Sequence, residues 1–132
     1  MLFKDLDSKW KLVDYSMSHS QLLIRSSSKK SRPWNIDIIF KGVTKILLPK
    51  VFEGIEIFKV ENLQDYTILQ DYHFISDENY ECLKIVTANE VYYFINCMAM
   101  GVYKNDLKSN FSSLGRYDTS ELNHELIEWY GF

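Results

Sequence analysis

Three histidines and two cysteines are the residues of this chain best suited to nucleophilic or metal chemistry, and their spacing supports neither. His19 has a serine on each side, but neighbouring residues of an extended chain point to opposite faces, which is poor geometry for a nucleophile and its base. His73 and His124 are distant from it in the sequence, and no Gly-x-Ser-x-Gly nucleophile elbow is present. We therefore expect no catalytic residues and no enzyme. A histidine beside a carboxylate in a cleft would reopen that question.

Metal and cofactor binding lack sequence support too. The chain contains no Cys-x-x-Cys, no His-x-x-x-His and no His-Glu-x-x-His motif. Asp77, Glu78 and Glu81 offer oxygen ligands, but without the glycine and the ligand spacing of a calcium loop. Five scattered glycines do not form a phosphate-binding loop. We expect no metal and no cofactor.

Charge is distributed unevenly along the sequence. Residues 1–60 contain eleven Lys and Arg against six Asp and Glu, a net charge of +5. Residues 61–132 contain four against twelve, a net charge of −8. A compact domain with such a division has an electrostatic field that can steer a charged partner.

The acidic part of the chain interleaves carboxylates with tyrosines. Tyrosines supply buried anchors at protein interfaces and carboxylates raise the association rate with a basic partner, although most acidic faces are merely solvated. We predict a partner-binding surface formed by Asp65, Tyr66, Asp71, Tyr72, Asp77, Glu78, Tyr80, Glu81, Glu121, Glu125 and Glu128.

A basic segment in the first half combines cations with an aromatic ring, the mixture that single-stranded nucleic acids bind. Its residues are Arg25, Lys29, Lys30, Arg32 and Trp34. The chain as a whole is acidic, with a pI of about 5.6, whereas nucleic-acid binders are typically basic. We interpret the segment as a solvated hairpin tip and expect no nucleic-acid partner.

The charged and aromatic residues described above must be positioned by short runs of alternating apolar and polar residues, which polar turns separate. The clearest lies at 34–41, where Ile36, Ile38 and Phe40 share one face. The pattern predicts strands at 10–17, 21–26, 34–41, 43–48, 55–60, 67–75, 80–87, 91–96 and 98–104.

The end of the chain changes period. One helical stripe, with spacing i, i+4, i+7 and i+8, is formed by Leu122, Leu126, Trp129 and Tyr130. Asp118 suits the N-cap and Glu121 the N3 position of a capping box. The spacing predicts a helix over roughly 119–130, with Glu121, Glu125 and Glu128 on a second face.

Together these patterns predict one domain over residues 1–132, mainly β, an antiparallel β-sandwich or partly open barrel with one C-terminal α-helix. The charged N-terminus lacks the apolar region of a signal peptide, and the longest apolar stretch, 91–103, is too short to span a bilayer. We expect a cytoplasmic protein without membrane contact. In that compartment Cys82 and Cys97 are expected to be reduced core thiols.

Segments of the first half resemble small bacterial proteins grouped with the immunity proteins of polymorphic toxin systems. They are 10–15 (WKLVDY), 19–26 (HSQLLIRS), 35–43 (NIDIIFKGV), 47–49 (LLP) and 54–57 (GIEI). The resemblance implies a cytoplasmic protein that binds and neutralises a cognate toxin, commonly a nuclease, and it carries over no catalytic residue. Two alternatives stay open: a small β-barrel that binds an apolar ligand, and a homodimeric interaction module joined through an exposed strand.

Overall fold

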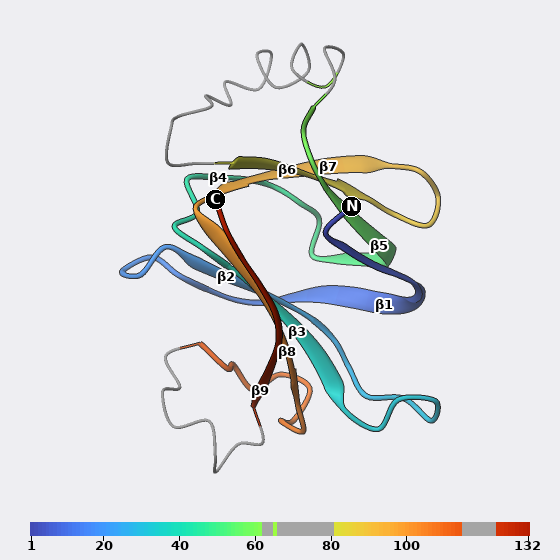
Figure 1. The fold of residues 1–132 in the computed structure, drawn as a ribbon. Coiled ribbons are helices and arrows are strands. Elements are labelled where there is room, and N and C mark those ends of the chain that lie inside the picture. Colours follow the sequence, from blue (N-terminus) through green and yellow to red (C-terminus); the bar gives the residue numbers. More distant parts are fainter. Residues whose placement is uncertain (62–64, 66–80, 115–123) are drawn as a thin grey trace.

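The computed structural model describes residues 1–61, 65, 81–114 and 124–132, and these residues form nine strands (Figure 1). The strands are β1 (Phe3–Ser16), β2 (Gln21–Ser26), β3 (Asn35–Lys41), β4 (Lys45–Leu47), β5 (Val51–Lys59), β6 (Glu81–Val86), β7 (Tyr92–Cys97), β8 (Ala99–Asn105) and β9 (Glu125–Gly131). All pair antiparallel in one open sheet, in the order β4-β7-β6-β5-β1-β2-β3-β8-β9. The predicted mainly β, antiparallel architecture is confirmed.

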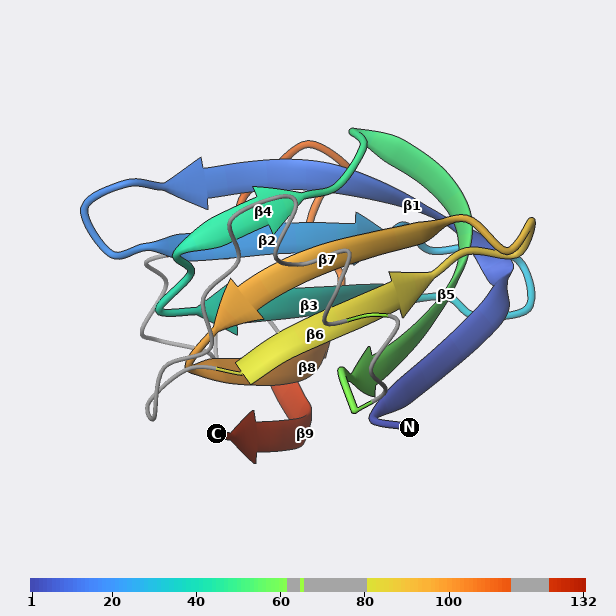
Figure 2. The same ribbon diagram turned by 90° about the horizontal axis from the view of Figure 1, so that it is seen from above.

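The sheet curls over itself, so that β4, β6 and β7 lie above β1, β2, β3 and β8 in Figure 1 and in front of β2, β3 and β8 in Figure 2. The chain passes between the two layers at Gly42, whose φ of 63° favours glycine, and again at Met98, which follows β7. The inner faces of both layers form one core, in which Trp10 and Phe40 are completely buried. The alternation that predicted strand 34–41 has this cause: Ile36, Ile38 and Phe40 all point into the core.

Strand β1 contains a wide bulge where it pairs with β5. Asp5 lies opposite Ile55 and Lys9 opposite Glu53, so four steps along β1 match two along β5. On its other side, β1 pairs with β2 only from Lys11 onward. The sheet therefore forks between the N-terminal part of β1 and the end of β2.

The prediction of a C-terminal helix is wrong for residues 125–130, which form strand β9 together with Gly131. Residues 119–123 of the predicted helix lie outside the described residues. Ile127, Trp129 and Tyr130 are residue types that favour strands, and β8 offers β9 a ladder running from Ala99 to Lys104. Pairing with a neighbouring strand thus overrides a helical spacing that only four apolar residues carry.

Most other predicted strands are confirmed, with shifted ends. β1 begins at Phe3 rather than at residue 10, and the predicted strand 43–48 shortens to β4, while 67–75 lies outside the described residues. Cys82 and Cys97 are both free and buried, as expected, and burial raises the pKa of each thiol to about 12. Within the described part of the chain, no helix has the length and apolar character needed to cross a bilayer.

Candidate functional site

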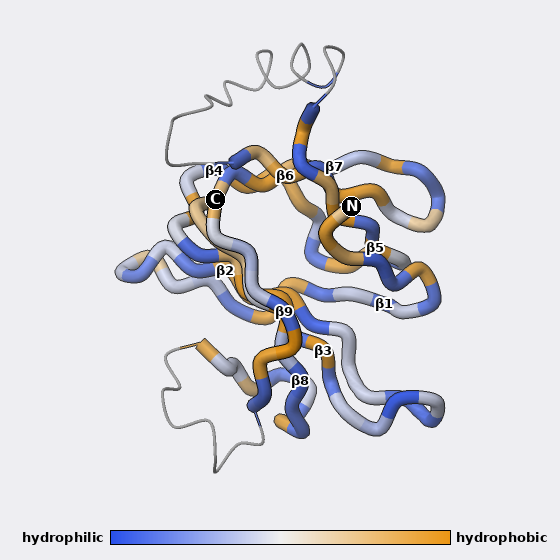
Figure 3. The backbone as a smooth tube through the Cα atoms, in the orientation of Figure 1, coloured by the Kyte–Doolittle hydropathy of each residue, from blue (hydrophilic) through white to orange (hydrophobic). Residues whose placement is uncertain are grey.

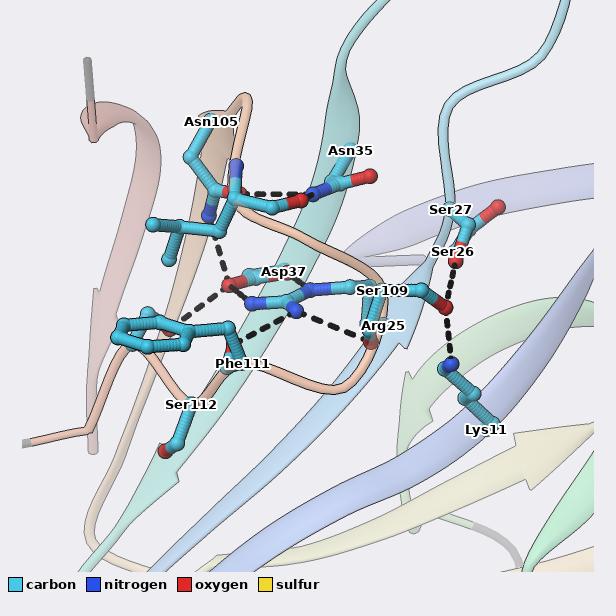
Figure 4. Close-up of polar contacts among 12 residues, drawn as sticks. Lys11, Arg25, Ser26, Ser27, Asn35, Asp37, Asn105, Ser109, Phe111 and Ser112 are labelled. Carbon is cyan, nitrogen blue, oxygen red and sulfur yellow. Dashed lines mark hydrogen bonds and ion pairs between the residues drawn. The ribbon is translucent and has the colours of Figure 1, made fainter. Parts of the chain in front are cut away.

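A buried ion pair joins β2 to β3 on the outer face of the sheet (Figure 4). Arg25 and Asp37 lie directly opposite each other in the β2–β3 register, and both side chains are 0% exposed. Arg25 Nε donates to Asp37 Oδ1 at 2.6 Å and Nη2 donates to Oδ2 at 2.9 Å. This bidentate geometry is the one that best offsets the desolvation of two buried charges.

The Asp37 carboxylate gathers further donors from the chain that follows β8. Oδ2 accepts hydrogen bonds from Asn105 Nδ2 at 2.8 Å and from the Ser113 hydroxyl at 2.7 Å. Asn105 Oδ1 in turn accepts from Asn35 Nδ2 at 3.0 Å. The carboxylate is thus saturated by neighbours, as a buried charge requires.

Arg25 holds the same segment through its backbone. Nη1 donates to the carbonyl oxygens of Lys108 at 3.1 Å, Ser109 at 3.2 Å and Phe111 at 2.7 Å (Figure 4). The carbonyl groups of a loop are not paired by a neighbouring strand, so they need such side-chain donors when they are buried. The ion pair therefore fastens residues 105–114 to the outer face of the sheet.

His124 connects this network to the start of β9. Its Nδ1 lies 3.2 Å from Asn105 Nδ2, and its ring stacks on Tyr103 with centroids 4.5 Å apart. Because the Asn105 amide nitrogen can only donate, Nδ1 accepts, and the proton of the neutral ring is on Nε2. Burial lowers the pKa of His124, outweighing the attraction of Asp37 for the protonated ring, and Arg25 and Lys41 lower it further.

We expect His124 to make stability depend on pH. Its pKa in the folded protein lies below the ordinary value of 6.5, so the unfolded chain binds the proton first as the pH falls. Stability is therefore complete above about pH 6.5, declines by at most about 1.4 kcal/mol per pH unit below it, and levels off under the lowered pKa. Urea unfolding at several pH values measures this. His124→Phe should flatten the decline; an unchanged slope in that variant would assign the dependence to other groups.

Ser113, His124 and Asp37 have the side-chain types of a hydrolase triad, but their arrangement in this network excludes that chemistry. The Ser113 hydroxyl donates to Asp37 and not to His124, and Asn105 stands between the histidine and the carboxylate. All three side chains are buried, so no substrate reaches Ser113. A nucleophile must bond to its base and be accessible, which assigns the cluster a structural role.

The predicted acidic surface is described only in part. Asp65 is buried and its Oδ2 lies 2.8 Å from Lys84 Nζ, while Glu81 is half-buried in β6. Glu125 and Glu128 are exposed together on β9, where Glu125 pairs with Lys104 at 3.0 Å. The remaining members lie outside the described residues: Tyr66, Asp71, Tyr72, Asp77, Glu78, Tyr80 and Glu121. A single surface uniting all of them stays a prediction.

The basic segment is less exposed than the sequence indicates. Arg25 is buried in the ion pair, and Arg32 donates to the backbone oxygens of Ser26 and Trp34 and to the Ser26 hydroxyl. Lys29 and Lys30 are exposed. The two arginines are therefore engaged in contacts within the chain, Arg25 with Asp37 and Arg32 with the β2–β3 connection.

Sequence reasoning missed the apolar character of β9 as an edge strand. Leu126, Ile127 and Trp129 are 55%, 48% and 47% exposed. Figure 3 shows a short hydrophobic stretch in β9, in orange just below its label. Side chains on both faces of the strand are exposed. The run of β-branched and aromatic residues after His124 was the available signal for a strand.

The two edges of the sheet differ in how they are protected. β4, at one edge, has three residues and includes Lys45. β9, at the other, has seven residues, none of them Lys, Arg or Pro. Short length and lysine are the usual protection of an edge against a further strand. β9 has only a bulge at Ile127 and its two glutamates.

No protein-family model matches this chain, and the searches of curated proteins and of solved structures found no similar protein. Among the residues that the structure describes, no three His, Cys, Asp or Glu side chains are grouped so that they could hold a metal ion. The exposed edge strand β9 is the feature of the described chain best suited to binding another molecule.

Proposed function

We propose that this protein is a non-enzymatic interaction protein that binds a basic segment of a partner protein along β9. The observation that carries the proposal is the seven-residue edge strand whose apolar side chains are about half exposed. A partner strand added to this edge would pair with the backbone groups of β9 that no described strand uses, and it would cover Leu126, Ile127 and Trp129. Strand addition combines backbone hydrogen bonds for affinity with side-chain contacts for specificity.

The charge of β9 favours a basic partner over a second copy of the chain. The strand contains Glu125 and Glu128 and no cationic residue, so β9 of a second copy would bring two more carboxylates and no opposite charge. Like charges placed opposite each other destabilise a strand pair, and opposite charges stabilise it. A strand with lysine or arginine fits both the charge and the apolar side chains.

The concrete form of this proposal is an immunity protein that meets a basic, nuclease-type toxin in the cytoplasm and blocks its surface. Support comes from the resemblance of the first half to such proteins and from the net charge of −8 over residues 61–132. Glu125 and Glu128 would act in place of nucleic-acid phosphates, with Trp129 as the apolar anchor.

A synthetic peptide tests the binding mode. We expect a fluorescently labelled peptide of alternating Lys and Val to bind the full chain, with an affinity that falls as salt increases. Neutralising both carboxylates in Glu125→Gln/Glu128→Gln should weaken binding roughly fivefold, since cross-strand charge pairs contribute about 0.5 kcal/mol each. Fluorescence anisotropy measures both effects.

The matched control is Glu53→Gln/Glu90→Gln, which removes two exposed carboxylates away from β9 and changes the net charge equally. It should leave the affinity unchanged. A peptide with Glu in place of Lys should not bind. Equal losses in both double variants would indicate attraction by net charge alone, and equal binding of both peptides would contradict the proposal.

A further inference from the structure

A second feature lies at the fork between β1 and β2, away from the edge strand. A pocket of roughly 450 Å³ opens where β1 leaves β2 and continues alongside β5 alone. The β1 bulge supplies one wall, and the end of β2 with the following loop supplies the other. Its lining is formed by Asp7, Ser8, Lys9, Trp10, Lys11, Arg25, Ser26, Ser27, Lys29 and Val51.

The pocket gathers positive charge. Lys9 is exposed at the pocket wall. Lys11 Nζ donates to Asn110 Oδ1 at 3.0 Å and to the Ser109 hydroxyl. Lys29 Nζ donates to the Ser8 hydroxyl at 2.9 Å and to the backbone oxygen of Asp7 at 3.1 Å. These acceptors are all neutral. Asp7 is the one carboxylate in the lining, against three ammonium groups. Arg25 adds no free charge because Asp37 neutralises it.

These contacts also hold the lysines in place. Lys29 reaches from the loop after β2 to the bulge of β1, and Lys11 reaches from β1 to the segment after β8. An ammonium group that is fixed before binding loses less side-chain entropy when a ligand arrives. The walls are therefore preorganised for an anion.

A buried donor without a partner lies in the same lining. Trp10 is completely buried, and its indole Nε1 has no hydrogen-bond partner within the part of the chain that the structure describes. Because the ring is completely buried, a ligand in the pocket does not reach this nitrogen. The residue nevertheless lies in the pocket wall, so its indole N–H can report on what enters the pocket.

We propose that this pocket binds a small organic anion, a carboxylate or a phosphate monoester. Its charged group lies among the ammonium groups of Lys9, Lys11 and Lys29, and its apolar part lies against Val51 and the lysine methylene chains. This site shares no residue with β9, so the proposal stands independently of the partner-binding function.

Nuclear magnetic resonance of the full chain tests this site through the Trp10 indole N–H. We expect titration with benzoate or phenyl phosphate to shift the Trp10 indole resonance with a saturable dependence on concentration, whereas benzyl alcohol, which has the ring without the charge, leaves it in place. The tighter of the two anions identifies the preferred charged group. Trp34 and Trp129 provide internal reference signals that should not move.

Lys9→Gln/Lys29→Gln should weaken anion binding about tenfold or more, because two of the three cations are lost. Lys4→Gln/Lys59→Gln removes two exposed lysines outside the pocket and should bind as the unmodified protein does. The same spectra show whether each variant is folded. A stationary Trp10 resonance, equal shifts with the alcohol, or equal losses in the two variants would each overturn the proposal.

Discussion

Replacing Asp37 with leucine is expected to lower the free energy of unfolding by about 3–5 kcal/mol, measured by urea denaturation at neutral pH. The variant leaves the Arg25 guanidinium buried at 0% exposure without its carboxylate. It also removes the acceptor of Asn105 Nδ2 and of the Ser113 hydroxyl. The uncompensated charge and the loss of this acceptor by two donors act in the same direction.

The companion variants separate the charge from the packing. Arg25→Met also leaves one buried charge unpaired, and Arg25→Met/Asp37→Leu leaves none. The double variant should lose less stability than the two single variants together, because each single loss includes the cost of the abandoned partner. A strictly additive double variant would contradict the coupling inferred here. Part of the stability lost in Arg25→Met should also be lost in the double variant, because Arg25 Nη1 donates to three backbone carbonyl oxygens as well.

The network bears on the proposed partner binding because of the strand that it positions. Asn105 is the last residue of β8, and His124 is the residue before β9, so their contact sets where the edge strand begins. Arg25 and Asp37 fasten the chain that follows β8 on the same face. The proposed docking strand thus starts beside a buried and extensively hydrogen-bonded polar network.

Alternation along the chain was sufficient to predict the mainly β fold. The strand at 34–41 shows why, since one face of it is entirely core and each second residue had to be apolar. The prediction of a C-terminal helix was wrong for the opposite reason. Almost every side chain of β9 is exposed, so burial imposed no period of two on its sequence, and a chance helical spacing was the stronger pattern.

The ion pair could not be predicted from the sequence one residue at a time. Arg25 and Asp37 look like surface charges because each follows an apolar neighbour in an alternating run. The β2–β3 register places them opposite each other, and residues 105–113, which are distant in the sequence, supply their further hydrogen-bond partners. Of the predicted partner-binding residues that the structure describes, Glu125 and Glu128 do lie together, but on a strand edge and not on a helix face.

Replacing Trp129 with alanine is expected to have the largest effect on partner binding, about a 30-fold loss of affinity for the Lys-Val peptide. Trp129 is 47% exposed on the open edge strand, and burying an aromatic anchor at the centre of an interface contributes about 2 kcal/mol or more. The loss should appear mainly as faster dissociation, because the ring carries no charge that would steer association.

Trp34 provides a closely matched control. It is 40% exposed, and Lys104 Nζ lies 5.3 Å from its ring centroid, as Lys41 Nζ lies 5.1 Å from that of Trp129. The two indoles therefore share exposure and a covering cation and differ in position, since Trp34 lies in the β2–β3 connection. Trp34→Ala should bind the peptide unchanged. Equal losses in both variants would mean that any exposed tryptophan attracts the peptide, and β9 would have no special role.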